Sequence, residues 1–168
     1  NSLLHNSGNN VKYLGNRYEN GSGVYKAPTV SAGTPDADFT IPFTPAVTLG
    51  GGETGITYSI RLGFYSKVGT RVHAQGTIVL TNKGSSTGAM KIANLPFTSN
   101  ATTNNQGCAS LSVDGFTGVS GAVVGYMLPN DTAITLNFTG TGSATAVNDT
   151  HATNTTNFTF AIDYEAAS

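Results

Sequence analysis

Residues 82–88, NKGSSTG, bring together glycine, lysine, serine and threonine, the residue types that bind phosphate in nucleotide-binding loops. Such a loop has glycine, four further residues and then Gly-Lys-Ser/Thr, so that its backbone amides surround the phosphate at the start of a helix. Here Lys83 precedes both glycines of the stretch, and no helical periodicity follows it. The stretch is therefore interpreted as a turn between two strands.

The histidines and carboxylates form no catalytic or metal-binding pattern. His5, His73 and His151 are far apart, and none has a cysteine or carboxylate at metal-ligand spacing. Asp36 and Asp38 are the closest carboxylate pair, but no EF-hand sequence continues from them, so a solvated turn is predicted. A glycosidase needs two carboxylates that face each other, and the sequence does not select a pair from Glu53, Asp114, Asp131, Asp149 and Asp163. We predict no metal site and no cofactor.

The candidate nucleophiles also lack partners in the sequence. Cys108 is the single cysteine, so no disulfide can form within the chain, and no motif supplies the base that a nucleophilic thiol needs. No G-x-S-x-G elbow occurs. We therefore predict that Cys108 is a semi-buried structural thiol and that this chain is not an enzyme.

Sugar binding is a separate possibility, because β-sandwich proteins often stack sugar rings on aromatic side chains. Tryptophan, the strongest platform, is absent, and seven tyrosines remain. Strand phase favours a core position for Tyr58 and Tyr65. The candidate glycan contacts are Tyr18, Tyr25 and Tyr126.

The composition excludes several kinds of partner. Only 10% of the 168 residues are charged, against about 25% in typical soluble domains. The net charge is −1, and the 8 lysines and arginines are scattered, which argues against nucleic acid and anionic membranes as partners. No apolar run is long enough to span a bilayer, and no charged-then-apolar leader is visible. We expect one domain with a tail, cut from a longer protein.

Strict alternation of apolar and polar residues predicts the secondary structure. It places Ile56, Tyr58 and Ile60 on one face of a strand, and the same pattern recurs in residues 108–113, 132–138 and 157–164. Turn signals rich in glycine or asparagine separate these segments. We predict an all-β fold, an antiparallel β-sandwich of jelly-roll type over residues 39–168, preceded by an irregular neck or connector over residues 1–38.

Residues 63–80 predict a hairpin whose register can be derived. Gly69 and Thr70 form a two-residue loop of type II′, in which glycine takes the positive φ. If Val68 lies opposite Arg71, every cross-strand pair has residue numbers that sum to 139, which pairs Tyr65 with Ala74. The face that carries these two residues is the predicted core side.

The opposite face of this hairpin is too apolar for plain solvent-exposed surface. It carries hydrophobic side chains among polar ones, which indicates a covered or interfacial surface. The predicted interface residues are Leu62, Phe64, Val68, Val79 and His73. The alternative is a register shifted by one residue, as a three-residue loop would produce, which returns the apolar residues to the core.

Residues 43–97 resemble a module found towards the C-terminal end of bacteriophage tailspike and tail-fibre proteins. The shared elements, in order, are T-P-x-x-x-(apolar)-G-G, T-G-I-T-Y, G-(aromatic)-Y-x-K-x-G, L-T-x-K-G-S-x-T-G and L-P-F. The sequence departs from the pattern at residues 45–47, and the remaining C-terminal part has no matching motif. The resemblance implies a homotrimeric β-sandwich that follows a β-helical shaft, with any depolymerase site elsewhere in the parent protein.

We accordingly expect a non-catalytic tailspike or tail-fibre module, on the extracellular face of the phage tail, that locks a homotrimer and contacts bacterial surface polysaccharide during host attachment. Residues 1–26 would then be the end of the shaft or the linker from it. Two alternatives remain open. One is a dedicated carbohydrate-binding module, and the other is a self-cleaving folding-chaperone domain, suggested by the Asn-Ser start of the sequence.

Overall fold

The computed structural model describes residues 18–19, 25–26, 41–102, 106–140 and 143–167. The chain divides into two compact units, residues 1–35 and residues 36–168. In the first unit, β1 (Tyr18–Glu19) pairs antiparallel with β2 (Tyr25–Lys26). The neck expected over residues 1–38 otherwise lies outside the described residues, and its attachment to a shaft stays a prediction.

The second unit is built from strands, and no helix occurs in the part of the chain that the structure describes. Its strands are β3 (Ile41–Phe43), β4 (Ala46–Leu49), β5 (Ile56–Val68), β6 (Arg71–Lys83), β7 (Met90–Ala93), β8 (Gly107–Asp114), β9 (Val123–Met127), β10 (Ile134–Thr139), β11 (Ala144–Ala146) and β12 (Asn157–Glu165).

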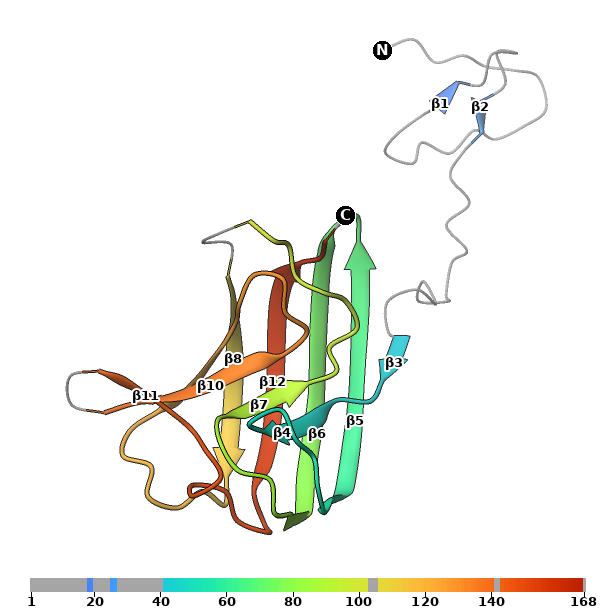
Figure 1. The fold of residues 1–168 in the computed structure, drawn as a ribbon. Coiled ribbons are helices and arrows are strands. Elements are labelled where there is room, and N and C mark those ends of the chain that lie inside the picture. Colours follow the sequence, from blue (N-terminus) through green and yellow to red (C-terminus); the bar gives the residue numbers. More distant parts are fainter. Residues whose placement is uncertain (1–17, 20–24, 27–40, 103–105, 141–142, 168) are drawn as a thin grey trace. The chain divides into compact units, whose positions relative to one another are not determined.

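These strands form one antiparallel sheet that curls on itself. Its order is β3-β5-β6-β12-β8-β9-β10-β7-β4, with β11 paired to β10. The long strands β5, β6 and β12 run side by side, and β4, β7 and β10 cross in front of them (Figure 1). The predicted all-β antiparallel architecture is confirmed, and the two layers are opposite parts of one continuous sheet.

The core lies between these two layers. Phe158, Phe160, Ile162 and Tyr164 alternate along β12 and are all buried, as the sequence pattern predicts. From the opposite layer, β4, β7 and β10 contribute further buried residues to the same cluster. The predicted inward faces of β8 and β10 are confirmed in the same way: Ala109, Leu111 and Val113 pack against the core, and Ile134, Leu136 and Phe138 are part of it.

The predicted β5–β6 register is confirmed. From Ile60 to Val68, each residue of β5 lies opposite the β6 residue that brings the sum to 139. Gly69 has φ of +62°, and among the described residues positive φ outside glycine occurs only at two asparagines, so Thr70 takes the negative φ that a type II′ turn requires. The alternative with a shifted register is therefore wrong.

One detail of the predicted strand faces is wrong. Ile56 and Tyr58 pack against the core, but Ile60 points away from it and is 45% exposed. The ladder shifts between Tyr58, which lies opposite Leu80, and Ile60, which lies opposite Val79. The extra residue in this β-bulge reverses the side-chain alternation, because a shift by one residue moves every later side chain to the other face.

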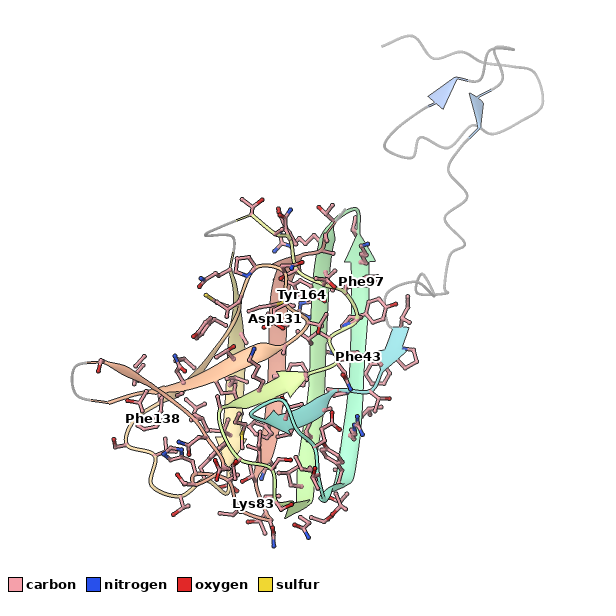
Figure 2. All side chains as sticks on the ribbon, viewed as in Figure 1. Phe43, Lys83, Phe97, Asp131, Phe138 and Tyr164 are labelled. Atoms are coloured by element: carbon pink, nitrogen blue, oxygen red, sulfur yellow. The ribbon has the colours of Figure 1, made fainter. Side chains whose placement is uncertain are left out.

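Two tyrosines tie the long strands to the crossing layer. The Tyr58 hydroxyl accepts a hydrogen bond from the Val47 N–H at 3.0 Å. The Tyr164 hydroxyl accepts one from the Phe97 N–H at 3.3 Å and donates one to the Phe97 carbonyl at 3.1 Å (Figure 2). Burial raises the pKa of Tyr58, and it raises the pKa of Tyr164 to about 12. Tyr58 is thus a structural residue, and so is Tyr65, which packs on the core between the rings of Phe43 and Phe97.

We expect the Tyr164→Phe variant to lose about 1–3 kcal/mol of unfolding free energy at neutral pH, because the partly buried Phe97 amide and carbonyl lose this partner. The raised pKa adds a pH effect. Tyr164 ionises near pH 10 in the unfolded chain and near 12 in the folded one, so its contribution is complete below pH 10 and is lost as the pH rises through 12. Urea unfolding at pH 7 and pH 10.5 measures both effects, and a variant with unchanged stability and the wild-type alkaline loss would contradict this role.

Candidate interaction face

The four strands β5, β6, β12 and β8 turn one side to the core and the other side outward. We call the outward side the outer face. Its side chains are Ile60, Leu62, Phe64, Ser66 and Val68 from β5; Arg71, His73, Gln75, Thr77 and Val79 from β6; Asn157, Thr159, Ala161, Asp163 and Glu165 from β12; and Cys108, Ser110, Ser112 and Asp114 from β8. No described strand covers it.

The apolar residues of the outer face are concentrated on β5. Leu62 is 49% exposed and Val68 is 72% exposed, while Phe64 is half-buried. With Ile60, these side chains form a line along the strand, which we call the apolar column. Val79 of β6, also half-buried, lies directly opposite Ile60 and extends the column sideways. Single exposed apolar residues are ordinary, but three in succession, with Val68 one position beyond Ser66, indicate a surface that is covered by something.

Polarity changes across the outer face from β5 to β8. The ladder places Leu62 beside Thr77, then Thr159, then Ser112. The next row runs Phe64, Gln75, Ala161, Ser110. These two rows contain no ionisable group. The apolar side chains are thus at one edge of the face and small hydroxyl side chains are at the other.

A shallow groove of about 550 Å³ lies over these two central rows. Leu62 and Phe64 form its β5 side, and Ser110 and Ser112 form its β8 side. Along its middle, the Thr77 and Thr159 hydroxyl oxygens are 3.5 Å apart. The groove combines an aromatic ring, an aliphatic side chain and several neutral hydrogen-bonding groups.

The charged side chains gather near the β5–β6 turn. Asp163 Oδ2 is 3.3 Å from His73 Nδ1, and Asp163 Oδ1 is 3.6 Å from Arg71 Nη2. All three side chains are about half exposed or more, so these pairs contribute little to the stability of a single chain. Glu165 lies opposite Arg71 on the neighbouring strand. Both signs of charge are therefore present side by side.

The structure brings all five predicted interface residues to the outer face: Leu62, Phe64, Val68, Val79 and His73. Sequence reasoning missed Ile60, although the rule of pairs summing to 139 places it opposite Val79 and so identifies it. It also missed the hydroxyl side chains of β12 and β8, because no local pattern shows that these strands flank β6. That these residues form an interface stays a prediction.

The predicted glycan contacts are not brought together in the described part of the chain. Tyr126 lies on β9, opposite Cys108 and Thr135, and does not line the groove. Tyr18 and Tyr25 lie on β1 and β2, and their side chains are outside the described residues. Two aromatic residues line the groove, Phe64 from the outer face and the buried Phe160 from the core.

The remaining candidates for chemistry are the stretch of residues 82–88, the thiol of Cys108 and the possible metal ligands. Residues 84–89 connect β6 to β7, so GSSTG lies in a turn between strands, as predicted, while Asn82 and Lys83 are the last residues of β6. Cys108 is exposed, so the prediction of a semi-buried thiol is wrong, because its side chain falls on the outward phase of β8. Among the described residues, no three His, Cys, Asp or Glu side chains come together as metal ligands would, and no helix is long and apolar enough to cross a membrane.

The fold defines the class of protein: an all-β module whose curled antiparallel sheet leaves one broad face open. Comparison with solved structures finds the crystal structure of Dettilon tailspike protein (gp208) at a TM-score of 0.61 and 20% sequence identity. The match covers 75% of this chain and 23% of the tailspike chain. The two proteins therefore share a fold, and the present chain corresponds to under a quarter of the tailspike's length. No family model and no curated protein matches the sequence.

Proposed function

We propose that this chain is a non-catalytic module of a phage tailspike or tail fibre, carried on the virion tail, and that it locks three copies together through the outer face. The single observation that carries the proposal is the apolar column, exposed beside two rows without charge, in a fold shared with a tailspike protein. The order of sequence motifs over residues 43–97 supports the same assignment.

The energetics of burial favour association through this face. Covering an aliphatic or aromatic side chain stabilises an assembly by about 1.5–3 kcal/mol. Leu62, Phe64 and Val68 together therefore supply several kcal/mol from each copy when they are covered. The central rows add no desolvation penalty for charge, and depletion of charge is typical of interface centres.

We expect the purified chain to scatter light as a trimer at micromolar concentration, with three times the chain mass of 17.2 kDa. Size-exclusion chromatography coupled to light scattering measures this mass without assuming a shape. A dilution series tests whether the assembly is specific, since a locked trimer keeps its mass while weak aggregation declines with concentration. A monomer across the series would contradict the proposal.

A second candidate function is carbohydrate binding, and the groove favours it. Phe64 offers a ring face, and the threonine and serine hydroxyls beside it offer hydrogen bonds to sugar. A trimer that buries the outer face excludes this function there, so the two candidates compete. We expect, on this alternative, that host lipopolysaccharide or capsule binds to a monomer, that Phe64→Ala abolishes binding, and that Tyr126→Ala preserves it. Failure of all such glycans to bind on an array would dismiss it.

A further inference from the structure

We infer that Tyr58 and Arg61 take the place of a neighbouring strand along the free edge of β4. By doing so, they prevent this edge from pairing with an extended segment of a second copy. β4 ends the strand order, and among the described strands only β7 pairs with it. A free strand edge presents N–H and C=O groups that readily bind another extended chain. This inference is independent of the proposed function, which concerns the outer face.

The residues on the free edge of β4 are identified by the direction of their backbone groups. Successive residues of an antiparallel strand point these groups alternately toward the paired strand and away from it. The N–H and carbonyl of Leu49 bond with Gly52 in the following turn, at 2.9 and 3.0 Å, so Leu49 points away from β7. Val47 and Pro45 have the same phase. Pro45 has no N–H, so only its carbonyl needs a partner.

Side chains of β5 supply the remaining partners of this edge. Arg61 Nε donates a hydrogen bond to the Pro45 carbonyl at 2.6 Å. The Val47 N–H donates to the Tyr58 hydroxyl at 3.0 Å, and that hydroxyl donates to the Val47 carbonyl over 3.4 Å. Val47 is fully buried, so water does not replace these partners. The free edge of β4 is therefore saturated without a strand beside it.

The β-bulge of β5 brings both capping side chains to the same side of the strand. In a regular strand, residues three positions apart point to opposite faces, so Tyr58 and Arg61 would not both reach β4. The extra residue before Ile60 reverses the alternation, and the two side chains lie opposite the core residues Leu80 and Ile78. The guanidinium carbon of Arg61 is 4.8 Å from the centre of the Tyr58 ring, a cation–π contact that holds the caps together.

The other end of the strand order is protected in a different way. β3 has Pro42 at its centre, and proline offers no N–H to a further strand. β4 itself contains no proline and no charged residue. Its protection therefore comes from the side chains of β5.

Hydrogen exchange at single amides, followed by NMR, tests the capping. In Tyr58→Phe, we expect the Val47 amide to exchange about tenfold faster relative to the Thr48 amide. Val47 loses its partner, whereas Thr48 points toward β7 and keeps its ladder bond. The matched control is Tyr164→Phe, which removes a hydroxyl that also bonds a backbone N–H and carbonyl, but at Phe97, outside the strands. It is expected to leave the ratio unchanged. An unchanged ratio in Tyr58→Phe overturns the capping.

Light scattering over a dilution series tests whether the caps prevent association. We expect Tyr58→Phe combined with Arg61→Met to form species larger than the wild-type chain at equal concentration, and these species to decline on dilution. Tyr164→Phe is expected to keep the wild-type mass. Comparison with the wild-type mass isolates pairing through β4, whichever oligomer the outer face forms. If the double variant does not fold by circular dichroism, each single variant carries the same test.

The exchange of the Val47 amide also shows whether larger species form through β4. We expect this amide to be protected again in them, because a strand of the second copy supplies a partner. Larger species with an unprotected Val47 amide overturn the inference, and so does a folded double variant that keeps the wild-type mass at every concentration. A wild-type chain that is monomeric contradicts the trimer proposal and leaves this inference standing.

Discussion

The Leu62→Asp variant is expected to lose the trimer and scatter light at the single-chain mass of 17.2 kDa. Leu62 lies in the apolar column, 49% exposed in one chain, and its row contains no ionisable residue. In the proposed assembly each of the three copies buries one such aspartate away from water, and no cation lies within its row. An unpaired buried charge costs several kcal/mol, more than the lost leucine contact itself.

The matched control for this change is Thr145→Asp, which adds the same charge at an exposed position on β11, away from the outer face. It is expected to keep the trimer mass. Circular dichroism on both variants separates dissociation from unfolding, because a free Leu62→Asp chain keeps its strand spectrum. A Leu62→Asp protein that remains a trimer at low micromolar concentration would show that the outer face is not the interface.

The second large effect is expected in the core. Phe158→Ala should lower the free energy of unfolding by about 3–5 kcal/mol, because a large-to-small change at a packed site loses the transfer energy of the ring and leaves a cavity. Phe158 is fully buried on β12, and its ring meets Phe116 edge-on at a centroid distance of 5.5 Å. Small domains are stable by only about 5–15 kcal/mol in total, so this loss is a large share.

Urea unfolding of the monomeric Leu62→Asp background measures this effect free of association. The informative comparison is Phe64→Ala in the same background, since Phe64 is on the outer face and only half-buried. Its loss is expected to be much smaller than that of Phe158→Ala. Equal losses for the two variants would mean that Phe64 belongs to the core of its own chain, which would remove the reason to expect a covering partner.

The sequence is sufficient to predict those features of the structure that depend on residues close together in the chain. Alternation with period two assigns the buried faces of β8, β10 and β12, because successive side chains of a strand point to opposite sides. The turn at Gly69 and Thr70 fixes the β5–β6 register, because a two-residue loop leaves one way to pair the strands beside it. These local rules placed Leu62, Phe64 and Val68 on the outward side.

The sequence is insufficient to predict those features that depend on pairing between strands far apart in the chain. β4 and β7 are four residues each; β4 pairs with β7, and β7 pairs with β10, so their existence depends on contacts made far along the chain. All four residues of β4 are buried, which removes the alternation that would identify a strand. The bulge beside Tyr58 depends on how β6 pairs with it, and it moved Ile60 to the outer face against the simple pattern.

The sequence by itself therefore determined the fold class, the central hairpin with its register, and the surplus of apolar side chains on one side of β5. Only the tertiary structure decided that β12 and β8 extend this side into a broad face, with hydroxyls at the far edge and a groove between. The physical reason is that side-chain alternation and turn geometry act over a few residues. The neighbours of β6 across the sheet are set instead by which strands, up to about ninety residues apart in the chain, bury the same core.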